Sequence, residues 1–369
     1  MIPYGKQSIR DDDINSVVKV LKSDFLTTGP KVSEFENSLV KYCGVKYVVA
    51  VCNGTAALHL AYLAAGLKTG DEVIVSPNTF VATTNMILAV GAKPVFCDIR
   101  LDTYNIDETK ITKLLTKKTK AIVAVDFAGQ PAEYQKIKNI CKKYKLLLIE
   151  DAAHSLGADY HGRKAGNLGD VATMSFHPVK SITTGEGGVV LTNNKDIWER
   201  LIKFRNHGTT KDRRGFNVMT DFGYNYRLTD IQAALGINQL SRLNKFVNTR
   251  RKLANRYINQ LKSVSQIILP LEQKDLHSSW HLFVIRTKKA YDRLPLYNFL
   301  KTKGIGVNFH YPTVYSQPFY RRNGYAKTKL KNADIYASQA ITIPLFPALN
   351  LEQQDYVVNS IKEYYKMSS

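Results

Sequence analysis

The stretch Leu146-Leu-Leu-Ile-Glu-Asp151 decides the fold of this chain of 369 residues. Four consecutive apolar residues without polar alternation predict a strand that is buried on both faces, and such strands belong to parallel sheets covered by helices. A parallel sheet binds ligands at the carboxyl ends of its strands, and Asp151 lies at such an end. The stretch therefore predicts an α/β fold with a candidate functional carboxylate at Asp151.

The sequence on both sides continues the pattern of a helix-covered sheet. Apolar strand candidates cover residues 47–51, 72–76, 94–98, 120–126, 145–151, 171–176 and 189–192. Amphipathic helices are expected between the first five of them, at residues 55–66, 79–90, 107–116 and 132–144. This alternation predicts a mainly parallel sheet with helices on both faces. Strand-like segments between residues 158 and 192 follow one another without a helix, which predicts hairpins and one antiparallel strand.

The length of the chain indicates two domains, because 369 residues exceed one ordinary hydrophobic core. Helices are expected over residues 229–239 and 243–264, and the second of them leaves the large domain. Ile268-Leu-Pro270 and the aromatic-rich strands after Ser279 indicate a second α/β unit. We therefore expect a large domain over residues 1–242, which includes the N-terminal segment, and a smaller C-terminal domain over residues 243–369.

A single lysine, Lys180, follows the expected strand 171–176 and opens a glycine-rich segment that ends at Gly188. Burial disfavours an ammonium group and lowers the pKa of a lysine, and a partly desolvated lysine forms Schiff bases with carbonyl compounds. An exposed surface lysine is the alternative in a chain so rich in lysine, but Asp151 at the neighbouring strand end argues against it. Pyridoxal phosphate requires this pair, because the carboxylate keeps the pyridine nitrogen protonated while the lysine holds the aldehyde.

The turn after the strand 47–51 is a candidate phosphate site. Its sequence, Cys52-Asn-Gly54-Thr55-Ala56, leads from the strand into a helix. A small, glycine-containing turn at a helix start presents free N–H groups and the positive end of the helix dipole to an anion. The signal is weak alone, because any strand-to-helix turn looks similar. With Asp151 and Lys180 downstream, the turn becomes the third part of one predicted site.

These motifs, in this order, resemble the DegT/DnrJ/EryC1/StrS family of sugar aminotransferases. The likeness covers nearly the whole chain and continues in Leu26-Thr-Thr-Gly-Pro30, Asn78-Thr-Phe80, Gly223-Tyr-Asn225-Tyr-Arg227 and Ile343-Pro-Leu-Phe-Pro347. The resemblance implies the aspartate-aminotransferase fold (fold type I of the pyridoxal-phosphate-dependent transferases), pyridoxal 5′-phosphate as cofactor, and transamination of a nucleotide-linked keto sugar. Segments 176–188, 279–285 and 304–311 look closest to the branch of pseudaminic acid biosynthesis. That branch implies a UDP-linked 4-keto amino sugar as substrate, aminated at C4, and glutamate as amino donor.

The family positions imply a role for each candidate side chain. Lys180 is the expected catalytic residue, which holds the cofactor and moves a proton to or from the substrate carbon. The expected cofactor contacts, besides Lys180, are Gly54, Thr55, Ala56, Phe80, Asp151, His154, Ser175 and Asn225. The expected substrate contacts are Tyr4, Thr27, Glu186, Arg227, His310 and Tyr311.

Several of these roles compete with plainer ones. Phe80 is expected to stack on the pyridine ring, although an ordinary core phenylalanine would give the same pattern. His154 is expected to reach the phenolic oxygen of the cofactor, against a hydrogen bond within the core. Glu186 orients substrate or caps its turn, and Arg227 holds phosphate in a bidentate contact or forms a surface salt bridge. Asn225 is expected to reach the phosphate in the neighbouring subunit, which implies a homodimer with shared active sites.

Composition narrows the class of protein. The formal net charge of +21 allows nucleic-acid binding, but no basic cluster is interleaved with aromatic residues, and lysines at helical spacing indicate solvated outer helices. A positive field would also attract a nucleotide sugar. The N-terminus lacks the apolar core of a signal peptide, and no run approaches the roughly 20 apolar residues of a membrane span. The four cysteines are scattered, so we expect a reduced, cytoplasmic protein without a metal site and with no membrane or nucleic-acid partner.

Three rival functions are compared with this one, and a fourth class of enzyme is disfavoured. One is the same chemistry on another nucleotide sugar, such as a dTDP-linked keto hexose or a UDP-linked 4-keto pentose. A family dehydratase carries histidine in place of the lysine, so Lys180 argues against it. A non-catalytic, basic nucleic-acid-binding protein would leave the three motifs unexplained. A dinucleotide oxidoreductase is disfavoured, because no G-x-G-x-x-G turn follows the first strand candidate.

Overall fold

The computed structural model describes residues 1–367, and a seven-stranded sheet forms its centre. The strands are β1 (Tyr47–Val51), β2 (Glu72–Val75), β3 (Lys93–Phe96), β4 (Thr119–Val125), β5 (Leu147–Asp151), β8 (Val171–Ser175) and β9 (Gly188–Thr192). They lie in the order β1-β9-β8-β5-β4-β2-β3, and only β9 is antiparallel to its neighbours. The predicted strands and the predicted antiparallel strand are therefore confirmed.

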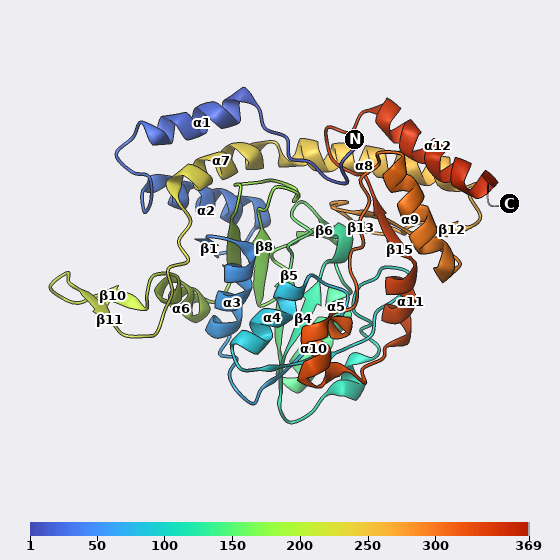
Figure 1. Ribbon diagram of the computed structural model, residues 1–369. Coiled ribbons are helices and arrows are strands. Elements are labelled where there is room, and N and C mark those ends of the chain that lie inside the picture. The colour runs from blue at the N-terminus through green and yellow to red at the C-terminus, as the bar shows by residue number, and fades with distance from the viewer. Residues whose placement is uncertain (368–369) are drawn as a thin grey trace.

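Helices cover both faces of this sheet, because its strands are apolar on both. The helices of this part of the chain are α1 (Asp11–Leu21), α2 (Pro30–Cys43), α3 (Gly54–Ala64), α4 (Val81–Ala89), α5 (Tyr134–Tyr144), α6 (Lys195–Arg205), α7 (Asp230–Ser241) and α8 (Leu243–Leu261). Within β1, Val48 and Ala50 pack with α2, α7 and α8, whereas Val49 and Val51 pack with α3 and α6. Figure 1 shows α1, α7 and α8 along one side of the molecule and the sheet below them. The alternation of side chains along a strand thus serves two separate cores.

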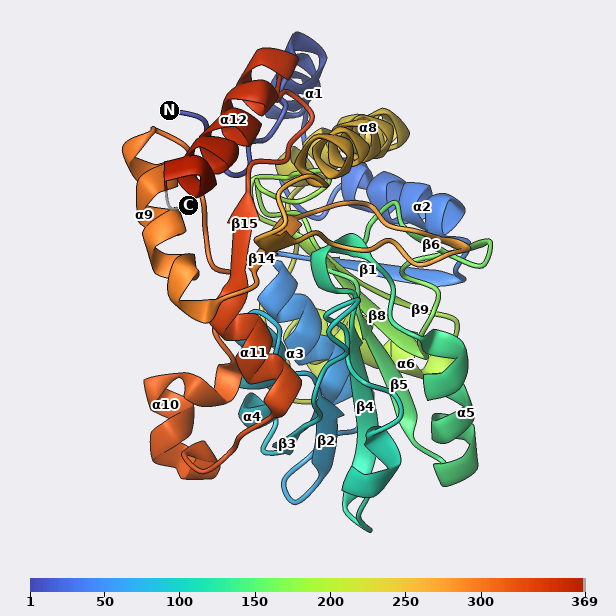
Figure 2. The ribbon, with the colours of Figure 1, turned by 90° about the vertical axis from the view of Figure 1, so that its right-hand side faces the viewer.

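The second half of the chain builds a smaller sheet with its own core. Its sheet has the order β12-β14-β15, formed by β12 (Ile267–Ile268), β14 (Phe283–Thr287) and β15 (Ala340–Ile343). The helices are α9 (Arg293–Thr302), α10 (Pro318–Tyr320), α11 (Lys331–Gln339) and α12 (Leu351–Met367). This sheet and α12 stand beside the large sheet (Figure 2). The N-terminal half of α8 packs in the large core and its C-terminal half packs in this second core.

The chain crosses between the two parts at several other places. Ile2 forms a bridge with Ile305 and packs in the second core, which brings the N-terminus to the smaller part. In return, Val314 and Tyr320 pack against the large sheet. A third sheet joins β13 (Leu276–His277) to the hairpin of β6 (Asp159–Tyr160) and β7 (Arg163–Lys164). The domain boundary at residue 243 stays a prediction, and α8 begins at that residue.

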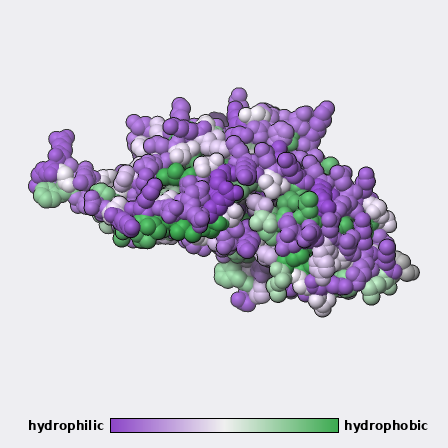
Figure 3. Space-filling model, turned by 90° about the horizontal axis from the view of Figure 1, so that it is seen from above, coloured by the Kyte–Doolittle hydropathy of each residue, from purple (hydrophilic) through white to green (hydrophobic). Residues whose placement is uncertain are grey.

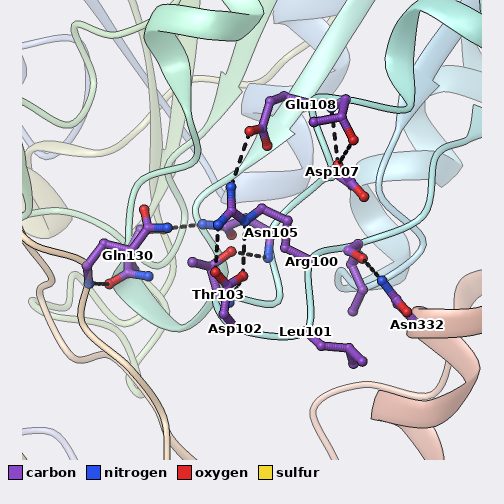
Figure 4. Close-up of polar contacts among 12 residues, drawn as sticks. Arg100, Leu101, Asp102, Thr103, Asn105, Asp107, Glu108, Gln130 and Asn332 are labelled. Atoms are coloured by element: carbon purple, nitrogen blue, oxygen red, sulfur yellow. Dashed lines mark hydrogen bonds and ion pairs between the residues drawn. The ribbon is translucent and has the colours of Figure 1, made fainter.

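The predicted helix over residues 107–116 is wrong. The segment holds only a short 3₁₀ helix, η1 (Ile111–Leu114). The side chain of Asp107 accepts hydrogen bonds from the N–H and the hydroxyl of Thr109, at 3.1 and 2.6 Å, and such local bonds compete with helix formation. Upstream, Arg100 forms ion pairs with Asp102 at 2.6 Å and Glu108 at 3.2 Å (Figure 4). The loop after β3 is therefore held by side chains and not by a helix.

The remaining described segments include a β-hairpin that projects from the body. Its strands are β10 (Thr209–Lys211) and β11 (Asn217–Met219), and Figure 1 shows it extending away from the helices around it. Among residues 1–367, no helix is both long and apolar enough to cross a membrane.

The position of α1 depends on one buried carboxylate, and this gives a test of the fold. Asp13 is fully buried and accepts hydrogen bonds from Asn238 at 2.8 Å and Gln239 at 3.0 Å, and it pairs with Arg242. Removing one partner of a buried pair leaves an uncompensated charge, so Asp13→Ala is expected to lower the free energy of unfolding by about 3–5 kcal/mol. Urea unfolding measures the difference.

The neighbouring Asp12 supplies the matched control. Its side chain is 54% exposed and lies 3.9 Å from Arg242, so Asp12→Ala is expected to cost less than about 1 kcal/mol. Equal losses in the two variants would contradict the role given to Asp13.

Candidate active site

A cavity of about 650 Å³ opens at the carboxyl ends of β5 and β8 and is closed by segments from both parts of the chain. The predicted site residues that line it are Tyr4, Gly54, Thr55, Phe80, Asp151, His154, Ser175, Lys180, Glu186, His310 and Tyr311. These residues come from segments that are far apart in the sequence, and the fold brings them to one place. Among residues 1–367, no group of three or more histidine, cysteine or acidic side chains is arranged to hold a metal ion.

Lys180 lies in the turn after β8. Its N–H donates to the carbonyl of His177 at 2.9 Å, and the segment then returns so that the N–H of Thr184 donates to the carbonyl of Phe176 at 3.0 Å. This tight loop directs the lysine side chain into the cavity wall. Burial lowers the pKa of Lys180 to about 8, although the carboxylate of Asp151 acts in the opposite direction. About a tenth of this amine is therefore neutral, and nucleophilic, at pH 7.

Asp151 is the last residue of β5 and is only 4% exposed. One carboxylate oxygen accepts from the hydroxyl of Thr83 at 2.7 Å and the other from the N–H of Ala153 at 3.2 Å. Thr83 is in turn 2.8 Å from the hydroxyl of Thr79. Burial raises the pKa of Asp151, and these bonds together with Lys180 limit the rise. The carboxylate is thus fixed in direction and lies close enough to Lys180 for the two charges to interact.

The adjacent Glu150 points to the other face of the strand, because successive side chains of a strand alternate. It is fully buried and accepts from the N–H groups of Gly166, Leu168 and Gly169 at 2.6, 2.8 and 3.2 Å. Burial raises the pKa of Glu150 to about 7. Its role is structural, because it holds the loop that leads into β8.

The start of α3 forms one end of the cavity. Its N-cap is Asn53, whose side chain accepts from the N–H of Ala56 at 2.8 Å. Gly54 lies so close to β8 that a Cβ atom there would come within 2.8 Å of the Cβ atom of Ser175. The first turn of a helix leaves N–H groups without intrahelical partners, and here they meet the cavity beside the Ser175 hydroxyl. This end of the cavity suits an anion such as phosphate.

Aromatic rings form the wall opposite that end. Phe80 is 56% exposed and its ring lies 5.9 Å from that of Tyr311, so it is not a core residue. The hydroxyl of Tyr311 lies 3.3 Å from Nε2 of His154. Tyr4 approaches the ring of His310 at 5.3 Å. Burial, together with the nearby Lys180, lowers the pKa of His310 to about 4, so this imidazole is neutral at physiological pH.

These residues fit pyridoxal phosphate. Nδ1 of His154 and the hydroxyl of Thr173 are buried at the cavity without a hydrogen-bond partner in the described chain. A polar ring substituent could satisfy such groups, Phe80 offers an apolar face to a flat ring, and the start of α3 offers N–H groups to a phosphate. The acid and the amine that the cofactor needs, Asp151 and Lys180, are both present.

Four predicted residues do not line the cavity of their own chain. Ala56 is buried, and its N–H is already bound to Asn53. Thr27 forms a backbone bridge with Thr229. Asn225 is exposed and forms a backbone bridge with Asn206, whose side chain also accepts a hydrogen bond from Arg227 at 2.5 Å. The predicted roles of these four residues therefore stay predictions.

The sequence analysis missed other cavity residues, including Asn53, Thr79, Thr83, Thr173, His281 and Asn308. Thr79 and Thr83 lie four residues apart beside Phe80, and this helical spacing was the signal for two hydroxyls on one face. His281 and Asn308 lie within the segments 279–285 and 304–311, whose likeness to the family was noted without a role for either residue.

Comparisons with known proteins agree with this geometry. The sequence model of the DegT/DnrJ/EryC1/StrS aminotransferase family matches residues 7–362. The UDP-4-amino-4,6-dideoxy-N-acetyl-β-L-altrosamine transaminase of Campylobacter jejuni subsp. jejuni serotype O:23/36 is 40% identical over 367 residues, which cover 98% of this chain and 96% of the relative.

Solved structures show the same architecture. PseC of Helicobacter pylori, an aminotransferase involved in the biosynthesis of pseudoaminic acid, superposes with a TM-score of 0.95 at 32% identity and covers 99% of both chains. The PMP-form of Spr1654 from Streptococcus pneumoniae, described as a candidate sugar aminotransferase, gives a TM-score of 0.96 at 29% identity over 100% of both chains.

The lowered pKa of Lys180 gives a pH prediction for the cofactor-free protein. Only the neutral amine attacks an aldehyde, so the rate of attachment of pyridoxal phosphate should rise with pH up to about 8. Below that pH it should fall about tenfold per pH unit. Borohydride trapping and peptide mapping measure the rate and locate the label, which is expected at Lys180.

Asp151→Asn is the matched control for this titration. The carboxylate raises the pKa of Lys180, so its removal should shift the midpoint to lower pH. A label on another lysine, or a midpoint near that of a free lysine at about 10.4, would contradict the interpretation.

Proposed function

The chain belongs to the DegT/DnrJ/EryC1/StrS aminotransferase family, and we propose that it transfers an amino group from glutamate to C4 of a UDP-linked 4-keto amino sugar. The cofactor is pyridoxal 5′-phosphate. One observation carries the proposal: Lys180 and Asp151 stand at neighbouring strand ends and face one cavity. A second α/β unit closes that cavity, as a reaction sheltered from water requires.

The residues divide the work of transamination between them. Pyridoxal phosphate, when bound, would supply an aldehyde that takes up the amino group of the donor and passes it to the keto sugar, and a ring that withdraws electrons during both transfers. Lys180 would hold the aldehyde and, once released, move a proton at Nζ to and from the substrate carbon. Asp151 would keep a proton on the pyridine nitrogen, with its direction fixed by Thr83 and Ala153.

Other cavity residues would orient the two partners. Gly54, Thr55 and Ser175 would hold the phosphate at the start of α3, and Phe80 would lie against the ring. His154 would contact the phenolic oxygen. Because the pKa of His154 lies well below its usual value, through burial and the nearby Lys180, it would act there as a neutral group.

The proposed acceptor is UDP-2-acetamido-2,6-dideoxy-β-L-arabino-hexos-4-ulose. Support comes from the Campylobacter relative, which is named for the corresponding UDP-4-amino sugar, and from the structural match to PseC. Tyr4, Glu186, His310 and Tyr311 line the cavity and are the candidates for contacts with the sugar. Another nucleotide sugar, a dTDP-linked keto hexose or a UDP-linked 4-keto pentose, is the alternative. A nucleic-acid-binding function would give no role to the buried pair of Lys180 and Asp151.

The substrate proposal is tested in the reverse direction. Purified protein is offered 2-oxoglutarate with UDP-linked and dTDP-linked 4-amino sugars of defined configuration, and glutamate formation is measured. The UDP-linked 4-amino-4,6-dideoxy-N-acetyl sugar is expected to react fastest. Lys180→Ala should lose at least about three orders of magnitude, since it removes both the cofactor link and the proton carrier. Faster turnover of a dTDP-linked sugar or of a 4-amino pentose would overturn the assignment of the sugar but not that of the lysine.

We further propose a homodimer in which each active site uses residues of both chains. The hairpin β10–β11 projects from the body, and large apolar residues at it are exposed: Phe216 at 63%, Met219 at 65% and Phe222 at 72%. Figure 3 shows this hairpin, from above, extending far beyond the mostly hydrophilic face of the body. Asn225 and Arg227 follow the hairpin and lie outside the cavity of their own chain. No arginine lines that cavity among the described residues, so Arg227 of a second copy would supply a cation for the diphosphate.

Mixed dimers test the sharing of sites. Lys180→Ala and Asn225→Ala are each expected to be nearly inactive as homodimers. When differently tagged chains are combined, one site of the mixed dimer carries both defects and the other carries neither, so activity should return to half that of the wild type per dimer. No recovery in mixed dimers isolated through both tags would count against shared sites. The control mixture combines Asn225→Ala with Lys195→Ala, which changes an exposed lysine of α6, in place of Lys180→Ala.

A further inference from the structure

His281 is a buried cavity residue without an assigned role. It comes from the segment that leads into β14 and lines the cavity together with His154. The two imidazole rings lie 4.3 Å apart, centre to centre, at an angle of 41°. His281 is 4% exposed and His154 is 6% exposed, so little solvent separates or surrounds them. The side chain of His281 therefore packs against the ring of His154.

The backbone around His281 is fixed to the segments that follow β4 and β5. The N–H of Ser279 donates to the carbonyl of Gly129 at 2.9 Å, and its hydroxyl donates to the carbonyl of His154 at 2.8 Å. Gly129 has a φ of +100°, and a Cβ atom there would lie 2.4 Å from the Ser279 hydroxyl and 2.9 Å from the His281 N–H nitrogen. Only glycine permits this approach. These contacts thus fix the position of His281 relative to His154.

A buried arginine fixes the same segment from the other side. Nη1 of Arg250, from α8, donates to the carbonyls of His281 at 3.2 Å and Leu345 at 2.7 Å. Arg250 is 1% exposed, and no carboxylate pairs with it among the described residues. Its hydrogen-bond acceptors are backbone carbonyls. Burying a guanidinium group costs free energy, and here the group joins the segments of His281 and Leu345. His281 is consequently anchored to both cores of the protein.

The charged groups that act directly on the two rings are positive. Burial is the largest cause, and with Lys180 and His310 it holds the pKa values of His154 and His281 well below the usual value; Arg250 lowers the pKa of His281 further. Asp151 acts on Lys180 and on Tyr311. Nδ1 of each ring lacks a hydrogen-bond partner in the described chain, whereas Nε2 of His154 meets the hydroxyl of Tyr311.

We propose that His281 is a positioning residue for transamination, which acts through the ring of His154. Its imidazole fills the space behind His154, excludes water from it and prevents its rotation away from Tyr311. The role rests on the proposed function, since His154 is the expected contact of the cofactor's phenolic oxygen. His281 belongs to the second part of the chain. It would determine how the ring of His154 is oriented toward the cofactor.

The test compares His281→Asn, which removes the ring, with His281→Phe, which keeps a flat ring but no ionisable nitrogen. Histidine labelled with ¹³C reports the protonation of His154 in the cofactor-free protein by NMR, and the loss of one signal in His154→Asn assigns it. A free imidazole has a pKa of about 6.5. In the wild type, His154 should still be neutral at that pH. In His281→Asn, water should reach the ring and the pKa of His154 should rise by about one pH unit or more. In His281→Phe, His154 should stay neutral.

Activity gives the second measurement. His281→Asn should lower kcat by about tenfold to a hundredfold with little change in the KM of the sugar, because a misdirected group acts on the reaction more than on sugar binding. His281→Phe should recover most of the activity. His277→Asn, the same change at an exposed histidine of the same segment, should match the wild type in both measurements. Circular dichroism and thermal unfolding verify that each variant is folded.

Two outcomes would overturn the proposal. One is an unchanged His154 titration in His281→Asn. The other is an equal loss of activity in His281→Asn and His281→Phe, which would assign the effect to a nitrogen of His281 itself. If the wild type aminated no sugar, the proposed function would fail, while the NMR comparison would still decide whether His281 controls His154.

Discussion

The chemistry of the cavity requires an amine and a carboxylate to stand together where water is largely excluded. Asp151 is 4% exposed at the end of β5, and the side chain of Lys180 enters the same cavity from the loop after β8. Burial alone would discharge both groups. Thr83, the N–H of Ala153 and the mutual attraction of the pair oppose this effect. The sheet register that places Asp151 beside Thr173 of β8 is therefore as much a part of the chemistry as the two side chains.

This constraint explains why the sequence was informative about the large sheet and its cofactor site. An apolar run that ends in aspartate, and a lysine that follows the next strand, are local features, and neighbouring parallel strands bring their carboxyl ends together. Glu150 likewise could be assigned to the opposite face from the alternation along one strand. Local features failed for residues 107–116, where an apolar and basic pattern of helical spacing was outweighed by the hydrogen bonds that Thr109 donates to the side chain of Asp107. Periodicity does not measure such competition.

The wall opposite the sheet was much less predictable, because it is made by contacts between distant segments. His281 meets His154 across 127 positions of sequence, and the bond from the Ser279 hydroxyl to the His154 carbonyl spans 125. The periodicity of apolar residues does not predict contacts between segments so far apart in the sequence. Asn225 and Arg227 show a related limit, since their expected partners belong to a second chain. The close approach at Gly129 could not be predicted either, because a glycine at a turn looks the same in sequence whether or not another segment packs against it.

Helix α8 has a consequence for the shape of the cavity. The helix packs in the large core through Leu243 and Val247 and in the second core through Leu253 and Tyr257. Its 19 residues contain neither proline nor glycine, the usual sources of a sharp bend. A wide swing of one part about the other would have to break this helix or strip one of its packed faces. Helix α8 therefore holds the two parts in one relative arrangement, so the shape of the cavity between them is set by a continuous helix and not by the closing of two independent domains.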